Sequence, residues 1–227
     1  MNMVFDSKLK VVIFDMDGTL IDSERLHKVV QTDVLSKFGI EFKDEDYVAF
    51  VGMPARDLWG YLRDKYDIDL SVDDLIGMNR KEYYRFLRNK EGVFLMDGVY
   101  ELILEIKKRG FFVAIGTSAG RKTLDIVLDV FDLHNVFDFS VSADDVVFGK
   151  PNPEVFLKIA DFFGVNSNEC IVFEDAVHGI EAAKSAGMKC IAFVNRGANL
   201  QDVSKADFVL DDYEKFSVDR LVDIFNS

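Results

Sequence analysis

Two aspartates lie two positions apart at the end of an apolar, β-branched run in residues 11–20 (VVIFDMDGTL). Such a run is typical of a strand buried on both faces, and at strand period Asp15 and Asp17 point the same way. Two carboxylates held roughly 4 Å apart repel by about 4 kcal/mol at an effective dielectric of about 20, and a hard cation such as Mg²⁺ removes that repulsion. A strand that runs into an ordinary Asp-Gly turn fits the same residues, so the pair alone leaves both interpretations open.

A hydroxyl pair stands at the end of a second apolar run, where Thr117 and Ser118 follow residues 111–115 and precede Ala119 and Gly120. Small residues at this point allow a hydroxyl and backbone N–H groups to meet a phosphate oxygen. Threonine and serine are also frequent helix N-caps, and the segment taken alone favours that simpler interpretation.

Lys150 and an acidic pair complete the set of charged motifs. Two prolines follow within three residues of Lys150 and fix the backbone there, which suits a lysine that holds a carboxylate and a phosphoryl oxygen together. Glu174 and Asp175 end the apolar run Cys170–Phe173, and one of them can complete the ligand set of a cation; Asp175 can equally cap the following helix. Four such motifs in order favour one joint catalytic site.

The elements that must position these motifs alternate between short apolar runs and helical stretches, which is typical of a parallel sheet with helices on both faces. The expected strands are Val11–Phe14, Phe111–Ile115, Phe139–Val141, Cys170–Phe173, Cys190–Val194 and Phe208–Leu210. Residues 21–92 show helical patterns and no convincing strand. We therefore expect an α/β, Rossmann-like core of residues 1–20 and 93–227, with a small all-helical domain of residues 21–92 inserted after the first strand.

The expected helices have recognisable ends. Pro153 begins a helical pattern that runs to Phe163 and stops at Gly164. In the inserted block, Ser71 and Asp74 resemble a capping box that opens a helix. These signals predict three helix boundaries from local chemistry alone.

The composition predicts a globular protein without a nucleic-acid partner. Its 227 residues carry a formal net charge of −13, whereas nucleic-acid binding needs a basic face. Cys170 and Cys190 open apolar runs without metal-ligand spacing, so we expect buried free thiols. There is no secretory signal pattern and no apolar run long enough to span a bilayer, so we expect a cytoplasmic protein without a membrane partner, and a monomer.

The motifs resemble the pattern of the haloacid dehalogenase superfamily over essentially the whole chain. The family pattern D-x-D-G-T/V, Ser/Thr, Lys before Pro and an acidic pair is matched here at Asp15 and Asp17, Thr117, Lys150, and Glu174 with Asp175. The inserted block resembles the helical cap of the β-phosphoglucomutase-like branch, which includes many sugar-phosphate phosphatases. The second aspartate of the pattern, Asp17, separates phosphoryl-transfer members from dehalogenases, so the resemblance implies phosphoryl transfer.

The resemblance implies a covalent mechanism that uses Mg²⁺. Asp15 attacks the phosphorus, and Asp17 protonates the leaving oxygen and then takes a proton from water. Mg²⁺ binds the Asp15 and Asp175 carboxylates and the Asp17 backbone carbonyl, while Glu174 accepts hydrogen bonds from the ligand waters.

The resemblance also implies where a small phosphorylated substrate binds. Thr117 and Lys150 stabilise the phosphoryl oxygens, and the implied substrate-binding positions in the core are Gly18, Ser118 and Ala119. Two further candidates lie in the inserted block. His27 fits a substrate-facing and a surface position equally well. Arg56, in the segment GMPAR (52–56), is explained slightly better as a solvated arginine.

Phosphatase and mutase activities both fit this pattern. Sugar mutases of the branch hold a second phosphate with a Ser-Lys pair where this chain has Ala119 and Gly120, although Arg121 and Lys122 can supply charge nearby. We therefore expect a phosphatase for small phosphomonoesters, with sugar phosphates first, rather than a β-phosphoglucomutase that interconverts glucose 1-phosphate and glucose 6-phosphate. A non-catalytic phosphate-binding module is least favoured, because no catalytic position is missing.

Overall fold

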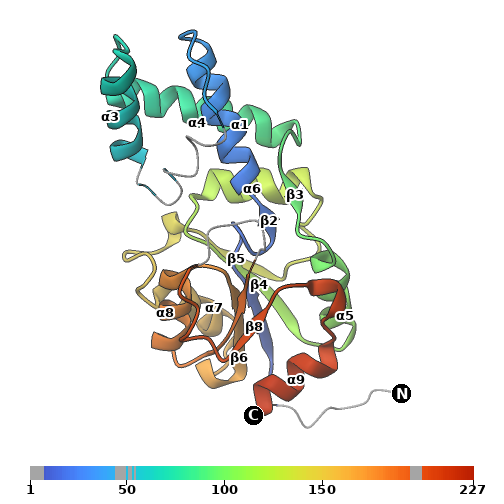
Figure 1. The fold of residues 1–227 in the computed structure, drawn as a ribbon. Helices are drawn as coiled ribbons and strands as arrows, with labels where there is room; N and C mark the ends of the chain where they lie inside the picture. Colours follow the sequence, from blue (N-terminus) through green and yellow to red (C-terminus); the bar gives the residue numbers. More distant parts are fainter. Residues whose placement is uncertain (1–7, 44–49, 51–52, 54, 195–200) are drawn as a thin grey trace. The chain divides into compact units, whose positions relative to one another are not determined.

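The computed structural model describes residues 8–43, 50, 53, 55–194 and 201–227 (Figure 1). The chain divides into two compact units, which we describe separately: a core unit of Met1–Asp22 and Phe94–Ser227, and an inserted unit of Ser23–Val93. The sequence places the two boundaries after residues 20 and 92. The observed divisions come two residues and one residue later, after Asp22 and Val93.

The core unit is built on a six-stranded sheet with the order β5-β4-β1-β6-β7-β8, in which every neighbouring pair is parallel. The strands are β1 (Val11–Phe14), β4 (Phe112–Gly116), β5 (Phe139–Val141), β6 (Cys170–Glu174), β7 (Lys189–Phe193) and β8 (Phe208–Leu210). The six expected strands are confirmed within one residue at each end. Strand β1 lies inside the sheet, between β4 and β6. All four of its residues are apolar and fully buried, as expected for a strand covered on both faces.

Helices cover both faces of this sheet (Figure 1). The helices of the core unit are α5 (Val99–Lys108), α6 (Arg121–Val130), α7 (Glu154–Phe163), α8 (Val177–Ser185) and α9 (Val218–Asn226), with short 3₁₀ turns η1 (Ala143–Asp145), η2 (Ser167–Glu169) and η3 (Tyr213–Lys215). Val11 and Ile13 of β1 pack into one apolar cluster with Phe156 of α7 and Ile180 of α8. Helices α5 and α9 pack together on the other side, so the α/β, Rossmann-like core is confirmed.

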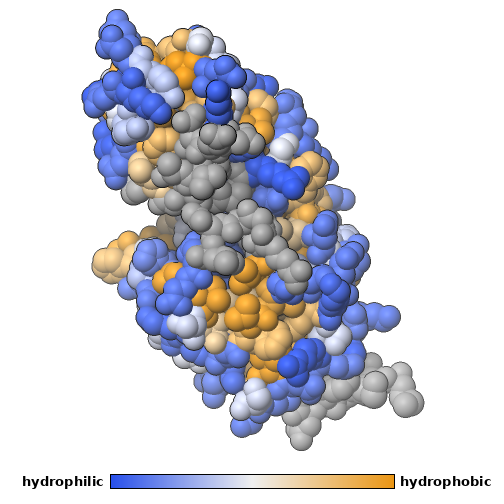
Figure 2. Space-filling view, viewed as in Figure 1, coloured by the Kyte–Doolittle hydropathy of each residue, from blue (hydrophilic) through white to orange (hydrophobic). Residues whose placement is uncertain are grey.

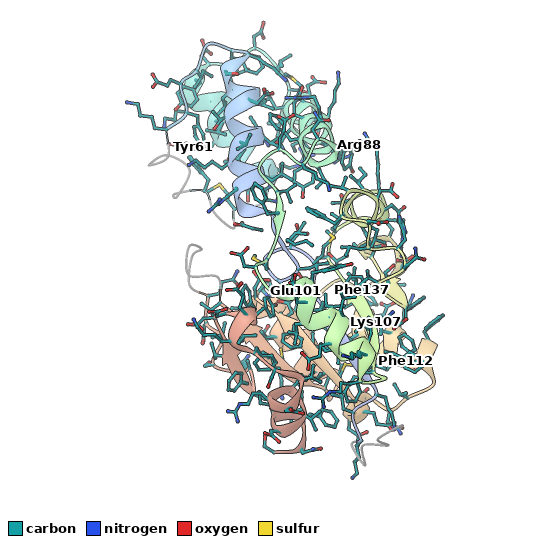
Figure 3. The ribbon with its side chains drawn as sticks, turned by 90° about the vertical axis from the view of Figure 1, so that its right-hand side faces the viewer. Tyr61, Arg88, Glu101, Lys107, Phe112 and Phe137 are labelled. Atoms are coloured by element: carbon teal, nitrogen blue, oxygen red, sulfur yellow. The ribbon has the colours of Figure 1, made fainter. Side chains whose placement is uncertain are left out.

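Helix α5 is fixed beside the sheet by a partly exposed polar contact. Lys107 donates to the carbonyl oxygen of Val136 at 2.6 Å and to Asp138 at 2.7 Å. Asp138 in turn accepts a hydrogen bond from the backbone N–H of Val113 at 2.8 Å. Figure 3 shows Lys107 and Phe137 on the side of the core unit that faces the viewer. One lysine therefore ties α5 to the segments that lead into β5.

Two short strands were not expected. The two-residue strand β2 (Ile21–Asp22) pairs antiparallel with β3 (Phe94–Leu95), so the expectation that residues 21–92 contain no strand is wrong at its first two positions. Two residues are too few for an alternating pattern, and their partner lies on the far side of the inserted unit in the sequence.

The inserted unit is helical, with α1 (Glu24–Ser36), α3 (Ala55–Tyr66) and α4 (Val72–Arg88) around an apolar cluster. The cluster is centred on Trp59, which is 1% exposed, together with Leu35 and Leu62. The expected cap of α4 is present, since Ser71 accepts a hydrogen bond from the backbone N–H of Asp74. Local chemistry therefore starts this helix where the sequence indicates.

No helix in the part of the chain that the structure describes is both long and apolar enough to cross a bilayer. Hydrophilic side chains cover much of the face drawn in Figure 2, interrupted by smaller apolar areas. The two cysteines, Cys170 and Cys190, are buried and free, as expected. Burial raises the pKa of the Cys170 thiol to about 12, so it acts as a small apolar side chain.

Candidate active site

Three of the sequence motifs meet where the central strands end. Phe14, the last residue of β1, lies opposite Ile115 of β4 and Phe173 of β6 in the parallel register. The next residue, Asp15, continues the ladder by donating its N–H to the carbonyl oxygen of Phe173 at 2.9 Å. Because these strands are parallel and aligned, their carboxyl ends bring the residues that follow them to one edge of the sheet.

An acid cluster forms at this edge from Asp15, Glu174 and Asp175. Each contributes one carboxylate oxygen, and these oxygens all lie within 4.8 Å of one another. Asp15 and Glu174 are buried, with 5% and 2% exposed, and Asp175 is half-buried. Three carboxylates so close together and so far from water are stable only beside positive charge or when protonated.

Lys150 supplies one positive charge to the acid cluster. Its Nζ lies 2.5 Å from Oδ1 of Asp15 and 2.8 Å from Oε1 of Glu174, and the side chain is 4% exposed. Burial alone lowers the pKa of Lys150, but the charges of Asp15 and Glu174 outweigh burial and raise it. The ammonium is therefore permanently charged and bridges the first and the fourth motif.

The loop that carries Lys150 is held by Glu154, a residue that the sequence analysis did not single out. The Glu154 carboxylate accepts hydrogen bonds from the backbone N–H groups of Val147 at 3.1 Å and Phe148 at 3.0 Å. These two bonds hold the pKa of Glu154 below its usual value. Asn152 closes the turn by donating its N–H to the carbonyl oxygen of Gly149 at 3.0 Å. The signal in the sequence is an acid in the first turn of a helix that begins after Pro153.

The acid cluster carries more negative charge than Lys150 compensates. Burial raises the pKa of Asp15 well above its usual value, Lys150 opposes this, and the charges of Glu174 and Asp175 add to it. Burial and the Glu174 charge raise the pKa of Asp175 to about 7. In addition, Oδ1 of Asp17 is buried and has no hydrogen-bond partner among the described residues. A site with surplus negative charge and only oxygen donors fits a hard divalent cation such as Mg²⁺.

Gly18 shapes the pocket beside Asp175. Its φ is +79°, and a Cβ at this position would lie 2.2 Å from Oδ2 of Asp175, so a side chain is excluded both by conformation and by space. Its N–H donates to the carbonyl oxygen of Ile21 at 2.9 Å. Thr19 then turns its hydroxyl toward Oδ1 of Asp175 at 3.4 Å. Gly18 therefore permits the close approach of the first and the fourth motif.

Thr117 is buried at the end of β4, and its Oγ1 accepts a hydrogen bond from the N–H of Ala119 at 3.0 Å. The side chain of Ser118 is exposed at the same edge. Helix α6 begins after Gly120, and its first N–H, that of Arg121, donates to Asp144 at 2.7 Å. The alternative that Thr117 or Ser118 caps a helix is therefore wrong.

The acidic pair likewise does not cap the next helix. The N-cap of α8 is Ala176, without a side-chain cap, so the alternative role for Asp175 is also wrong. Glu174 is held instead by the N–H of Ala176, which donates to its Oε2 at 2.6 Å, and by Lys150 on its other oxygen.

Gly179 is a further residue that the sequence analysis missed. It lies in the first turn of α8, and a Cβ at this position would fall 1.6 Å from Oε1 of Glu174. The carboxylate therefore occupies the space that any other residue would fill. The available signal was a glycine inside a helical pattern, which costs about 1 kcal/mol relative to alanine and so indicates a packing reason.

His27 and Arg56, the two candidates from the inserted block, have partners within the inserted unit. The His27 ring packs on Tyr83 with centroids 5.1 Å apart. Arg56 pairs with Asp73 at 2.5 Å, and both side chains are exposed, at 68% and 74%. Within the loop 52–56, Gly52 and Pro54 fall outside the described residues. A substrate contact by either candidate stays a prediction.

Comparison with known proteins identifies the family. A model of haloacid dehalogenase-like hydrolases matches residues 12–193. The chloroplastic protein SUPPRESSOR OF QUENCHING 1 of Arabidopsis thaliana is 35% identical over 188 residues, which cover 82% of this chain and 18% of that protein. A fructose-1-phosphate phosphatase of Escherichia coli is 32% identical over 184 residues, which cover 79% of this chain and 94% of that protein.

The solved structures agree with this family. A protein of Thermotoga maritima, named provisionally as a β-phosphoglucomutase, is 28% identical, with 96% of this chain and 97% of that chain covered and a TM-score of 0.81. The family match at residues 12–193 contains all four motifs of the sheet edge. The chain belongs to the haloacid dehalogenase-like hydrolases.

Proposed function

We propose that the protein is a Mg²⁺-dependent phosphatase that hydrolyses small phosphomonoesters, with sugar phosphates as the first class. The observation that carries this proposal is the contact between Lys150 and Asp15 inside the acid cluster. Asp15 is a buried carboxylate that an ammonium orients, and further carboxylate oxygens lie beside it. This arrangement suits nucleophilic attack on a phosphoryl group. The phosphatase relative from Escherichia coli supports the same reaction class.

Asp15 acts as the nucleophile in this proposal. One carboxylate oxygen of Asp15 forms a bond to phosphorus, and the bond from phosphorus to the ester oxygen breaks. Lys150, at 2.5 Å, favours the ionised form of Asp15 and orients the carboxylate. Asp17 gives its proton to the leaving oxygen and takes a proton from the water that then hydrolyses the aspartyl phosphate. The unpartnered Oδ1 of Asp17 is free to make these proton transfers.

Asp15, Asp175 and the backbone carbonyl of Asp17 would hold the Mg²⁺ ion, and Glu174 would orient its waters. When bound, Mg²⁺ supplies positive charge that offsets the repulsion between the phosphoryl group and the acids. Glu174 suits the outer role because Lys150 and the N–H of Ala176 already use its two oxygens. Thr117, Ser118 and Lys150 face the phosphoryl oxygens in this proposal.

A phosphatase is favoured over a mutase by the surroundings of Arg121. Its guanidinium donates to the Ser140 hydroxyl at 3.1 Å and to the Ser140 carbonyl at 3.3 Å, and it also pairs with Asp145. Arg121 is thus occupied, and the N–H of Ala119 is bonded to Thr117. Neither is available to hold a second phosphate, which a mutase needs when it rebinds a bisphosphate. The β-phosphoglucomutase assignment of the Thermotoga maritima protein keeps the mutase as the second candidate.

The inserted unit is the substrate-selecting cap in this proposal. Residues 21–92 would supply contacts to the leaving group, and His27 and Arg56 are the first positions to test. Arg56 can leave Asp73 at little cost, because an exposed ion pair contributes at most about 1 kcal/mol.

The experiment is a phosphate-release screen over hexose, pentose and nucleoside monophosphates, each with Mg²⁺ and with excess EDTA. β-Glucose 1-phosphate is included with and without glucose 1,6-bisphosphate, and glucose 6-phosphate is measured in parallel. Mg²⁺-dependent phosphate release supports the phosphatase. Faster formation of glucose 6-phosphate than of phosphate would replace it with the mutase.

A further inference from the structure

A group of aromatic rings adjoins the strand residues that precede the acid cluster. Phe14 precedes Asp15 and Phe173 precedes Glu174 in the sequence, and the two rings are parallel with centroids 4.7 Å apart. Tyr213, from η3, has its ring centroid 6.0 Å from that of Phe173. The rings of Phe14 and Phe173 thus pack together where β1 and β6 end, and Tyr213, from η3, packs against Phe173.

Among these three rings, only Tyr213 carries a polar atom. Its side chain is 2% exposed, and its ring stacks on Phe193 of β7 at 4.2 Å. The hydroxyl donates a hydrogen bond to the carbonyl oxygen of Thr19 at 3.2 Å. Burial raises the pKa of Tyr213, and the charges of Asp175 and Asp15 add to this, so the hydroxyl keeps its proton and remains a donor.

Thr19 connects this hydrogen bond to the acid cluster. Thr19 is fully buried, so its carbonyl oxygen cannot exchange Tyr213 for bulk water. Its own hydroxyl lies 3.4 Å from Oδ1 of Asp175. The contacts therefore run from Tyr213 through the backbone and side chain of Thr19 to one oxygen of Asp175.

Tyr213 is itself held in a fixed place. Asp212 caps η3 by accepting a hydrogen bond from the N–H of Glu214 at 3.0 Å. Gly98, which has a φ of +78°, lies so close that a Cβ there would be 2.8 Å from the backbone nitrogen of Glu214. The turn is thus packed against the start of α5, and the Tyr213 hydroxyl has a rigid base.

We propose that Tyr213 is a positioning residue for the divalent-cation site: its hydroxyl fixes the Thr19 peptide, and the Thr19 hydroxyl then fixes Asp175. This inference rests on the proposed function for its catalytic consequence. Its first effect is on cation affinity, because groups behind a metal ligand hold that ligand in its binding orientation.

The test compares Tyr213→Phe with the wild type and with Tyr100→Phe, a control in α5 that removes a tyrosine hydroxyl elsewhere in the core unit. Mg²⁺ affinity is measured by calorimetry without substrate. We expect Tyr213→Phe to weaken Mg²⁺ binding about 3–10-fold. This loss is smaller than the loss of affinity when a residue bonded directly to a metal ligand is removed. Tyr100→Phe should leave Mg²⁺ affinity unchanged. Turnover at saturating Mg²⁺ should stay within about twofold of the wild type, because Asp15 and Lys150 are untouched.

Thr19→Val and the double variant test the order of the contacts. If Tyr213 acts through Thr19, the double variant binds Mg²⁺ as weakly as Thr19→Val alone, whereas Thr19→Ser keeps the hydroxyl and restores affinity. If the fold losses of Mg²⁺ affinity in the two single variants multiply in the double variant, Tyr213 does not act through Thr19. Melting temperatures in EDTA show whether each variant folds.

Unchanged Mg²⁺ affinity in Tyr213→Phe would overturn the inference and leave the phosphatase proposal standing. If Tyr213→Phe weakens Mg²⁺ binding but the wild type releases no phosphate from any ester, the inference stands and the phosphatase proposal is overturned. A wild-type protein that does not bind Mg²⁺ would overturn both.

Discussion

The Nζ of Lys150 lies 2.5 Å from Oδ1 of Asp15, although 135 positions separate the two residues in the sequence. Two features produce this contact. Strands β1 and β6 pair in parallel, and Glu154 holds the Lys150 loop through hydrogen bonds to its backbone. In the absence of a cation, the contact stabilises a carboxylate that burial alone would protonate. It thus links the stability of the core unit to the proposed nucleophile.

Replacing Lys150 should lower the free energy of unfolding. Lys150→Met leaves Asp15 and Glu174 buried without their ammonium, and breaking a buried pair in this way costs about 3–5 kcal/mol. Urea unfolding in EDTA should show this loss at pH 8 and a smaller one at pH 5, because burial raises the pKa of Asp15 and its protonated form needs no ammonium. Lys108→Met, at an exposed position of α5, is the control. Equal stability of Lys150→Met and the wild type at pH 8 would contradict the account.

The acid cluster should make the metal-free protein less stable as pH rises. A carboxyl group whose folded pKa is raised stabilises the fold fully below its unfolded pKa, and that contribution disappears as pH rises through the folded pKa. Asp175 has a folded pKa of about 7 against an ordinary value of 3.8, so its contribution disappears between about pH 4 and pH 7. The measurement is the difference in unfolding free energy between the wild type and Asp175→Asn in EDTA. It should shift in favour of Asp175→Asn as pH rises, and a constant difference would contradict the expectation.

Mg²⁺ should reverse this loss. Binding requires the ionised acids, so Mg²⁺ should raise the melting temperature more at pH 8 than at pH 5.5 and should release protons on binding. Calorimetry in buffers of different ionisation enthalpy measures the protons directly. A Mg²⁺ effect that is equal at both pH values would argue against ligation by groups with raised pKa values.

Gly179 and Gly77 form a matched pair of helical glycines. A Cβ at Gly179 would lie 1.6 Å from Oε1 of Glu174, whereas a Cβ at Gly77 in α4 meets nothing within 4 Å. Gly179→Ala should therefore displace Glu174 and lower phosphate release at least about tenfold, because a partner of Lys150 moves. Gly77→Ala should keep full activity and add about 0.5–1 kcal/mol of stability. Full activity of Gly179→Ala would show that Glu174 does not need its present position.

Arg121 separates the phosphatase from the mutase. Because its guanidinium is bonded to Ser140 and Asp145, Arg121→Ala should lower the melting temperature and leave the Michaelis constant for a sugar bisphosphate within about twofold. Lys122→Ala, at the neighbouring exposed position, is the control. A sharp rise of the bisphosphate constant in Arg121→Ala alone would favour the mutase.

Most of the core could be predicted because its strands are short, largely apolar and bounded by clear breaks, and the two central ones, β1 and β6, are buried throughout. Val11–Phe14 is apolar throughout, and Pro153 and Gly164 bound α7 as expected. The strand β2 could not be predicted, since two residues carry no period and their partner is β3. The order of the strands explains why three of the four motifs meet, because β1 lies between β4 and β6.

The residues that the sequence did not reveal act through packing between distant elements. Glu154 and Gly179 have ordinary helical neighbours in the sequence. Their importance comes from contacts outside their own helices, with the Lys150 loop and with Glu174. Tyr213 lies 194 positions from Thr19, and no local pattern indicates that contact. Composition and spacing identify groups that can do chemistry, whereas the groups that hold them in place depend on the assembled fold.

The central claim is that Asp15 attacks phosphorus in a Mg²⁺-dependent hydrolysis. The most direct measurement is phosphate release from hexose monophosphates by the wild type and by Asp15→Asn, with Mg²⁺ and with EDTA. We expect Mg²⁺-dependent release by the wild type and a loss of at least about 10³-fold in Asp15→Asn, because a covalent nucleophile is not replaced by binding alone. The melting temperature of Asp15→Asn in EDTA should stay near that of the wild type, because Glu174 still pairs with Lys150 and the acid cluster loses one of its surplus negative charges. Wild-type turnover by Asp15→Asn, or full wild-type activity in excess EDTA, would contradict the account.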